Sequence, residues 1–253
     1  MREKFKKLSD SQWEVMAEFL PVQRKRKIDL RHVVDSIRWL NETGSQWRNL
    51  PECFPAWDAV YYYFRKWKHD GTVYFLNIGL NILERNAWGK EDTPSLICID
   101  SQSVKVAPFI KNDKGIDGNK KVNGRKRQVL VDTLGLVWAV FVHAANGNDS
   151  VYGCPLLEQI EGLCERLKKI LVDRGYEGRF IEFVRQKLGI EAEVSSRPPT
   201  ERGFVPVKWR WVSERTFGCF NFFRRLSKDY EKTVESAEAW ILWANCQMII
   251  SKW

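Results

Sequence analysis

The sequence predicts an α/β protein in which an all-helical region precedes a layered domain with a mixed sheet. Residues 9–92 show helical apolar spacing and little strand character, whereas apolar runs typical of strands begin at Ser95. From there, a strand hairpin is followed by alternating helices and strands, an order typical of mixed α/β layers. We therefore expect two domains, 1–92 and 93–253, joined through the KEDTP segment near residues 90–94.

The first region is predicted to contain short helices joined by tight turns. Ser9 is placed to cap a helix through Phe19, and Gly44 is placed to end a helix over 28–41. A further helix is expected over 57–68. Such a set is typical of a helix-turn-helix DNA reader. A small helical bundle whose aromatic side chains form its core remains an alternative.

The second region is predicted to open with a strand at 95–101 and a hairpin of strands at 127–133 and 136–143. The remaining elements follow in order: a helix over 149–166, a strand at 168–173, a helix over 178–188, a strand at 191–196, an extended loop over 197–207 and a helix over 209–231.

The chain is basic, and its positive charge is clustered. It has 41 Lys and Arg against 32 Asp and Glu, which gives a net charge of +9. The excess is concentrated in the segments 22–31, 105–128 and 208–232. A solvated charged face normally mixes both signs, so three separate basic clusters favour a polyanionic partner such as nucleic acid.

Several classes of protein are disfavoured by composition. The six cysteines form no C-x-x-C pair and the three histidines provide no zinc-binding spacing, so neither a disulfide framework nor a zinc site is expected. No apolar run reaches membrane-spanning length, and the first residues do not resemble a secretion signal. We expect a soluble, cytoplasmic protein.

Two acids follow apolar runs and are candidates for a functional site. Asp100 ends SLICID and Asp173 ends KKILVD, and acids at strand ends lie where α/β sheets bind ligands. Asp132 also ends an apolar run, but it opens the predicted hairpin turn, where Asp commonly accepts backbone hydrogen bonds. Taken singly, Asp100 and Asp173 are explained equally well by a structural role.

Glu214 is the third candidate acid, within a cationic and aromatic helix. Helical spacing places it on one stripe with Arg210, Gly218, Asn221 and Arg225. An ordinary Arg210–Glu214 pair is one explanation. A metal ligand beside phosphate-binding arginines is the other, and Gly218 favours it because glycine costs about 1 kcal/mol inside a helix. Three such carboxylates can bind two Mg²⁺ or Mn²⁺ ions for phosphoryl transfer.

The chain resembles DDE transposases of bacterial insertion sequences, of the insertion-sequence-five-like group. The resemblance is carried, in order, by WRNLPECFPAWDAVYYYFRKWKHDG, IDSQSVK, DGNKKVNGRKRQVLVDTLGL, VDRGYEG and RWVSERTFGCFNFFRRLSKDYE. It implies an RNase H-like catalytic domain, a metal-binding triad of Asp100, Asp173 and Glu214, and an N-terminal helical domain that helps recognise the ends of the element. It also implies a double-stranded DNA substrate and at least a dimer on DNA.

The chain departs from the resemblance in two ways. Related transposases have Tyr seven residues before the Glu and Lys seven after it, where this chain has Val207 and Asn221. We expect Arg224, Arg225 or Lys228 to replace their DNA contacts. The short interval from Asp173 to Glu214 leaves no room for a large inserted domain.

The basic segment Lys120–Arg127 is expected to follow the DNA backbone as a loop, with a mobile solvated loop as the alternative. The full set of predicted DNA-binding residues is Arg24, Lys25, Arg26, Lys27, Arg48, Tyr61, Tyr62, Arg65, Lys66, Lys120, Lys121, Arg125, Lys126, Arg127, Arg210, Arg215, Arg224, Arg225 and Lys228. The function predicted is DNA cleavage at the element ends followed by strand transfer. A metal nuclease that does not join DNA, and a non-catalytic DNA-binding descendant, are the alternatives.

Overall fold

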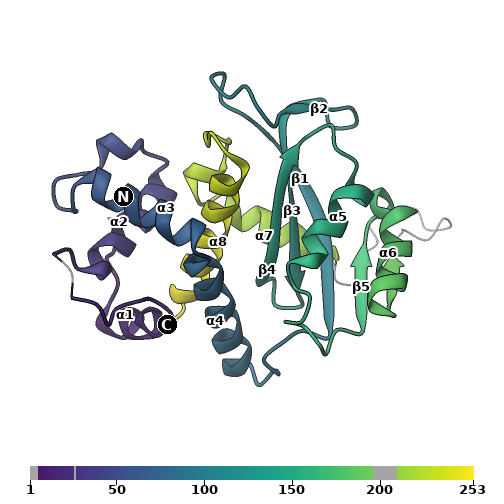
Figure 1. Ribbon diagram of the computed structural model, residues 1–253, viewed down its shortest axis with the longest axis horizontal. Coiled ribbons are helices and arrows are strands. Elements are labelled where there is room, and N and C mark those ends of the chain that lie inside the picture. The colour runs from purple at the N-terminus through teal and green to yellow at the C-terminus, as the bar shows by residue number, and fades with distance from the viewer. Residues whose placement is uncertain (1–4, 26, 196–209) are drawn as a thin grey trace.

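The structure, a computed structural model, describes residues 5–25, 27–195 and 210–253. A mixed sheet separates two groups of helices (Figure 1). The N-terminal helices lie together with the C-terminal helix on one side, and α5 and α6 lie on the other. The predictions for Arg26 and Val207 fall outside the described residues.

The helical region contains α1 (Asp10–Ala17), α2 (Leu30–Thr43), the short 3₁₀ helix η1 (Trp47–Asn49), α3 (Trp57–His69) and α4 (Thr72–Ala87). Ser9 caps α1 through a reciprocal capping box with Gln12, as its position in the sequence predicts. Gly44 ends α2 in the left-handed conformation (φ 69°), a conformation that glycine adopts without steric cost. The expected helical character of this region is confirmed.

The sheet contains β1 (Leu96–Lys105), β2 (Gly115–Asp117), β3 (Val122–Asp132), β4 (Val137–Ala144), β5 (Lys169–Val172) and β6 (Glu191–Val194). Its order is β2-β3-β1-β5-β6, and β4 pairs with β3. The β1–β3 and β3–β4 pairs are antiparallel, whereas β1–β5 and β5–β6 are parallel, so the predicted mixed sheet and hairpin are confirmed.

Strand β1 corrects one prediction. It continues beyond Asp100 as far as Lys105, which lies opposite Gly124 of β3. Asp100 therefore lies in mid-strand rather than at a strand end. The polar residues after Asp100 remain in the strand because the long partner β3 supplies hydrogen bonds along its whole length.

The later helices are α5 (Asp149–Glu158), the 3₁₀ helix η2 (Arg174–Tyr176), α6 (Arg179–Leu188), α7 (Arg210–Phe220), the 3₁₀ helix η3 (Arg224–Leu226) and α8 (Val234–Ile250). The single helix expected over 209–231 is wrong, because α7 ends at Phe220 and turns follow it. Asn221 and Arg225 therefore leave the stripe of Glu214. Helix α5 is also shorter than expected, and turns follow it through Leu163.

Helix α8 connects the two halves of the molecule. Its Trp240 ring stacks on Phe64 of α3 with centroids 4.5 Å apart. Its Asn245 donates to Asn77 and Asn81 of α4 and accepts from the backbone of Val137 in β4. The helical region and the sheet thus share one core. Across the described ranges, no helix is long and apolar enough to cross a membrane.

Candidate active site

The pairing of β1 with β5 places two of the predicted acids side by side. The parallel register aligns Cys98 of β1 with Leu171 of β5. Asp100 and Asp173 each follow this aligned pair by two residues in the sequence. Because side chains alternate across a strand, both acids lie on the same face as that aligned pair. One small pocket is lined by both carboxylates, together with Ser213 of α7.

Backbone and hydroxyl donors orient these two carboxylates. Asp100 Oδ2 accepts a 3.0 Å hydrogen bond from Ser213 Oγ, and its Oδ1 accepts from the amide of Ser101. Asp173 Oδ1 accepts from the amide of Gly175 at 2.9 Å, which makes Asp173 the cap of η2. Both acids are half-buried, so they are held in place while remaining accessible from the pocket.

Glu214 lies on α7, a helix that packs against β1 and β3, but it does not line the pocket of Asp100 and Asp173. Thr216 Oγ1 donates to the carbonyl of Gly135, and Arg215 Nη2 donates to that of Leu134, so the β3–β4 turn holds the helix. Glu214 is exposed and directly follows Ser213. Apart from its own helix backbone and chain neighbours, nothing lies within 4 Å of a Cβ built on Gly218, so the space beside this glycine is open as predicted.

The three predicted acids fit hard divalent cations in chemical type, since carboxylate oxygens are the ligands that Mg²⁺ and Mn²⁺ prefer. Asp100 and Asp173 line one pocket. Ser213 of α7 donates to Asp100, and Glu214 is the next residue in that helix. In the described part of the chain, no three His, Cys, Asp or Glu side chains lie close enough together to form a ready-made metal cluster. The argument for a metal site therefore rests on Asp100 and Asp173, which line the same pocket.

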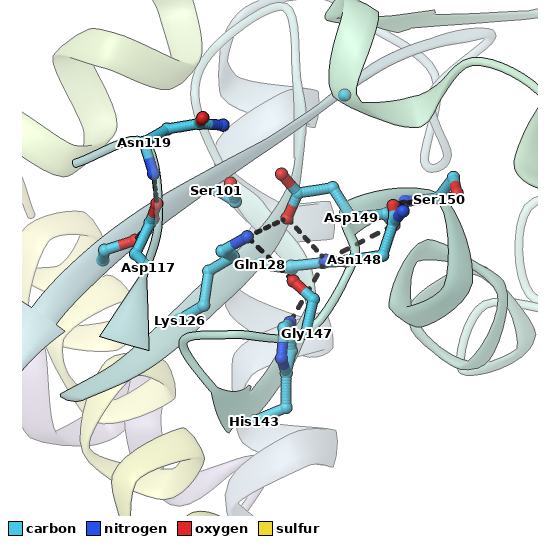
Figure 2. A network of polar contacts seen from close by, with 12 residues as sticks. Ser101, Asp117, Asn119, Lys126, Gln128, His143, Gly147, Asn148, Asp149 and Ser150 are labelled. Carbon is cyan, nitrogen blue, oxygen red and sulfur yellow. Dashed lines mark hydrogen bonds and ion pairs between the residues drawn. The ribbon is translucent and has the colours of Figure 1, made fainter. Parts of the chain in front are cut away.

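A polar network not predicted from the sequence surrounds Asp149 (Figure 2). Asp149 begins α5 and its Oδ1 forms a 3.1 Å ion pair with Lys126 and accepts from Gln128 at 3.2 Å. Asn148, and not Asp149, caps the helix by accepting from the Ser150 amide. The sequence signal for helix capping, an Asn-Asp pair before an apolar run, does not distinguish these two roles.

The predicted basic loop is corrected. Arg125, Lys126 and Arg127 belong to β3, and the two arginine side chains are 0% and 1% exposed. Arg125 forms an ion pair with Asp229, and Arg127 donates to the carbonyl of Leu226. Burial lowers the pKa of Arg127 to about 10. These arginines tie β3 to the segment after α7 and do not face solvent, so they cannot contact DNA as predicted.

Arg225 is also buried, and its role is again to connect elements. It pairs with Glu231, donates to the carbonyl of Ser45 and lies over the rings of Trp47 and Trp240. Its guanidinium thus joins the segment after α7 to the helical region. The prediction that Arg225 binds DNA is corrected for the same reason as for the arginines of β3.

Most other predicted DNA-binding residues lie at the surface. Arg215 is exposed but lies over the ring of Trp211, and Lys228 is half-buried beside Tyr230. Arg210 begins α7, and the prediction that its side chain binds DNA lies outside what the structure describes. The other exposed members of the set are Arg24, Lys25, Lys27, Arg48, Tyr61, Tyr62, Arg65, Lys66, Lys120, Lys121 and Arg224.

One face of α3 lines a wide groove. Tyr61, Tyr62, Arg65 and Lys66 form it together with Glu235 at the start of α8 and neighbouring residues. Tyr62 is 60% exposed, and the Arg65 guanidinium lies 5.9 Å from the centre of the Tyr61 ring. The groove presents aromatic and cationic side chains, which bind nucleic acid through stacking and phosphate contacts. It also contains the acids Asp58, Asp70 and Glu235, and Asp70 pairs with Lys66.

Comparison with known proteins agrees with this arrangement. Residues 8–76 match the family described as "Putative transposase of IS4/5 family", and residues 91–249 match the family described as "Transposase DDE domain". A relative from Burkholderia cepacia, named putative transposase for insertion sequence element IS402, is 31% identical over 130 residues. That match covers 49% of this chain and 61% of the relative.

The resemblance noted from the sequence is thus confirmed at the level of the family. The second family match extends over more than half of the chain and contains Asp100, Asp173 and Glu214. The mixed sheet with helices on both sides, preceded by a helical region, has the RNase H-like organisation expected for that domain. The chain belongs to the DDE transposase family.

Proposed function

We propose that the protein is a DNA transposase that cleaves phosphodiester bonds at the ends of an insertion sequence and joins the freed 3′-hydroxyl to target DNA. The observation that carries this proposal is that Asp100, Asp173 and Ser213 line one pocket, just beyond the last aligned pair of β1 and β5, Cys98 and Leu171. The family match supports the same chemistry.

Asp100, Asp173 and Glu214 would hold two Mg²⁺ or Mn²⁺ ions. When bound, such ions activate the attacking oxygen and stabilise the leaving oxygen at phosphorus. The chain's own contribution is orientation. Ser213 fixes one oxygen of Asp100, and the Gly175 amide fixes one oxygen of Asp173, so neither side chain must be ordered when the substrate arrives.

We propose that DNA also contacts the groove on α3. Tyr62 and Arg65 are exposed there, and Lys120 and Lys121 lie at the β2–β3 turn, where Lys120 donates to the carbonyl of Ser101, next to Asp100. Exposed cations of this kind contact phosphates and position the duplex without reading its sequence. Because two element ends must be joined to one target, we propose a homo-oligomer, at least a dimer, on DNA.

The test is a cleavage and joining assay on end-labelled duplexes that contain the sequences flanking the gene. The wild-type protein is compared with Asp100→Asn in Mg²⁺ and in EDTA. Asp92→Asn serves as the matched control, because Asp92 is an exposed acid in the linker before β1. Cleaved and joined products from wild type and Asp92→Asn with Mg²⁺, and none from Asp100→Asn or in EDTA, are expected.

Other outcomes would change the proposal in defined ways. Cleavage without joined products would indicate a nuclease. DNA binding without metal-dependent cleavage would indicate a non-catalytic DNA-binding protein. An Asp100→Asn variant as active as the wild type would show that the carboxylates act elsewhere.

A further inference from the structure

Asp149 brings a fourth carboxylate against the site. A Cβ built on Gly175 would lie 3.0 Å from Asp173 Oδ1 and 3.1 Å from Asp149 Oδ2. The two carboxylates therefore face each other across Gly175, a position where a larger side chain would collide with both. Asp149 comes from α5 and Asp173 from the end of β5, so the tertiary fold creates this approach.

The partners of Asp149 hold it in this orientation. Its Oδ1 is occupied by Lys126 and Gln128 of β3, and its side chain is only 17% exposed (Figure 2). Lys126 itself is fixed by a 3.0 Å hydrogen bond to the carbonyl of Gly147. The other oxygen, Oδ2, is thereby directed to the Gly175 side. A carboxylate with one oxygen tied to a buried lysine cannot rotate freely away from Asp173.

A buried phenol marks the same place independently. Tyr176 follows Gly175, is 0% exposed, and its hydroxyl has no hydrogen-bond partner in the structure. Burial raises the pKa of Tyr176 well above its ordinary value, and the nearby charges of Asp149, Asp100 and Asp173 raise this pKa further. Tyr176 packs against Gly153 of α5, since a Cβ built on Gly153 would lie 2.9 Å from the Tyr176 ring, so the phenol joins the helix of Asp149 to the turn after Asp173.

We propose that Asp149 is a positioning residue of the active site, whose negative charge, set by Lys126 and Gln128, strengthens divalent-cation binding at Asp173. This inference rests on the proposed function, because it assumes that Asp173 is a metal ligand. Asp149 need not touch the ion. A negative charge in this partly buried region attracts a divalent cation through the intervening Gly175, and residues around metal ligands commonly alter affinity about 10-fold to 100-fold.

The experiment measures Mn²⁺ binding to the full chain by the loss of the free Mn²⁺ paramagnetic resonance signal, without DNA or turnover. Asp149→Asn should weaken binding roughly tenfold. Its amide oxygen can still accept from Lys126 and Gln128, but the buried Lys126 loses its counter-ion, so a lower melting temperature is expected and binding is measured well below it. Glu177→Gln is the matched control, because it removes one exposed carboxylate close to the same turn, and it should change affinity less than about twofold.

A second variant predicts the opposite sign. Lys126→Met removes the cation that offsets Asp149, so Mn²⁺ binding should become tighter. If Asp149→Asn fails to fold, Lys126→Met alone tests the proposal. Unchanged or weaker Mn²⁺ binding by Lys126→Met then overturns it. Asp149→Asn with wild-type affinity, or a loss no larger than that of Glu177→Gln, also overturns it.

Asp173→Asn separates this inference from the proposed function. If it abolishes Mn²⁺ binding while Asp149→Asn has no effect, the role of Asp149 is refuted and the metal site stands. If Asp173→Asn has no effect on binding, the proposed metal site itself is misplaced, and the role of Asp149 is refuted with it.

Discussion

Two basic segments of this chain differ in whether their cationic side chains are buried or exposed. Lys120–Arg127 reads KKVNGRKR, and the α3 segment Tyr61–Lys68 reads YYYFRKWK. In the first, Arg125 and Arg127 are inside the protein, whereas in the second, Arg65 and Lys66 line an open groove. The first segment has five basic residues among eight and the second has three, yet the first holds the buried arginines, so charge density alone does not predict exposure.

The difference arises from what covers each element. One face of β3 is covered by the segment after α7, which supplies Asp229 and the carbonyl of Leu226 as partners for the arginines. Helix α3 packs through Val60, Phe64 and Trp67, and the helical period leaves the remaining faces in water. A strand within a sheet has two faces that can both be covered, but a surface helix buries only one stripe.

The largest expected effect tests the buried side of this comparison. Arg125→Ala should lower the free energy of unfolding by about 3–5 kcal/mol, because it leaves the fully buried Asp229 carboxylate without its cation. Urea unfolding followed by circular dichroism measures the change. Lys121→Ala, an exposed change in the same segment, should stay within about 0.5 kcal/mol. A loss below about 1 kcal/mol for Arg125→Ala would contradict the tie between β3 and Asp229.

Much of the fold could be predicted because its signals are local. The capping box at Ser9, the glycine end of α2 and the β3–β4 hairpin around Asp132 each follow from neighbouring residues. The end of α7 at Phe220 and the extension of β1 past Asp100 could not be predicted in this way. Both depend on partners far along the chain, and helical spacing or apolar runs contain no information about them.

The same limit applies to the candidate site. Asp100 and Asp173 could be chosen because each follows an apolar run, and the parallel register brings them together. Asp149 follows no apolar run, and its place opposite Asp173 depends on how α5 packs against β3. The buried roles of Arg125 and Arg225 depend likewise on acids that follow α7 in the chain.

The second prediction concerns a buried group beside the Lys126–Asp149 pair. His143 packs flat against Tyr152, with ring centres 3.9 Å apart, and burial lowers the pKa of His143 from 6.5 to about 4. Between these values the unfolded chain binds more protons than the folded one. The contribution of His143 to the free energy of unfolding is therefore fully present above about pH 6.5. It is lost as the pH decreases toward 4, by about 3 kcal/mol in total.

His143→Gln should remove this pH dependence, and the difference between variant and wild type in urea unfolding at pH 4 to 7 isolates it. Glu238 should show the opposite sign. Burial against β4 raises its pKa to about 7, so its contribution is present below its ordinary pKa and is lost as the pH rises through 7. Equal pH dependence in wild type and His143→Gln would show that the imidazole is reached by water.

The smallest effect tests the exposed side of the comparison. Arg65→Gln should weaken binding to a fluorescein-labelled duplex several-fold at about 0.15 M salt and reduce the slope of log affinity against log salt by about one, because one phosphate contact is lost. The free energy of unfolding should change by less than about 0.5 kcal/mol, since Arg65 is exposed.

Fluorescence anisotropy from 50 to 200 mM salt measures the slope, a range in which counterion release dominates affinity. The matched control is Lys90→Gln, which removes one exposed cation from the linker before β1 and should leave the slope unchanged. Equal effects of the two variants would mean that DNA senses only the net charge of the protein. The contrast between β3 and α3 would then concern stability alone, and the groove on α3 would have no part in binding.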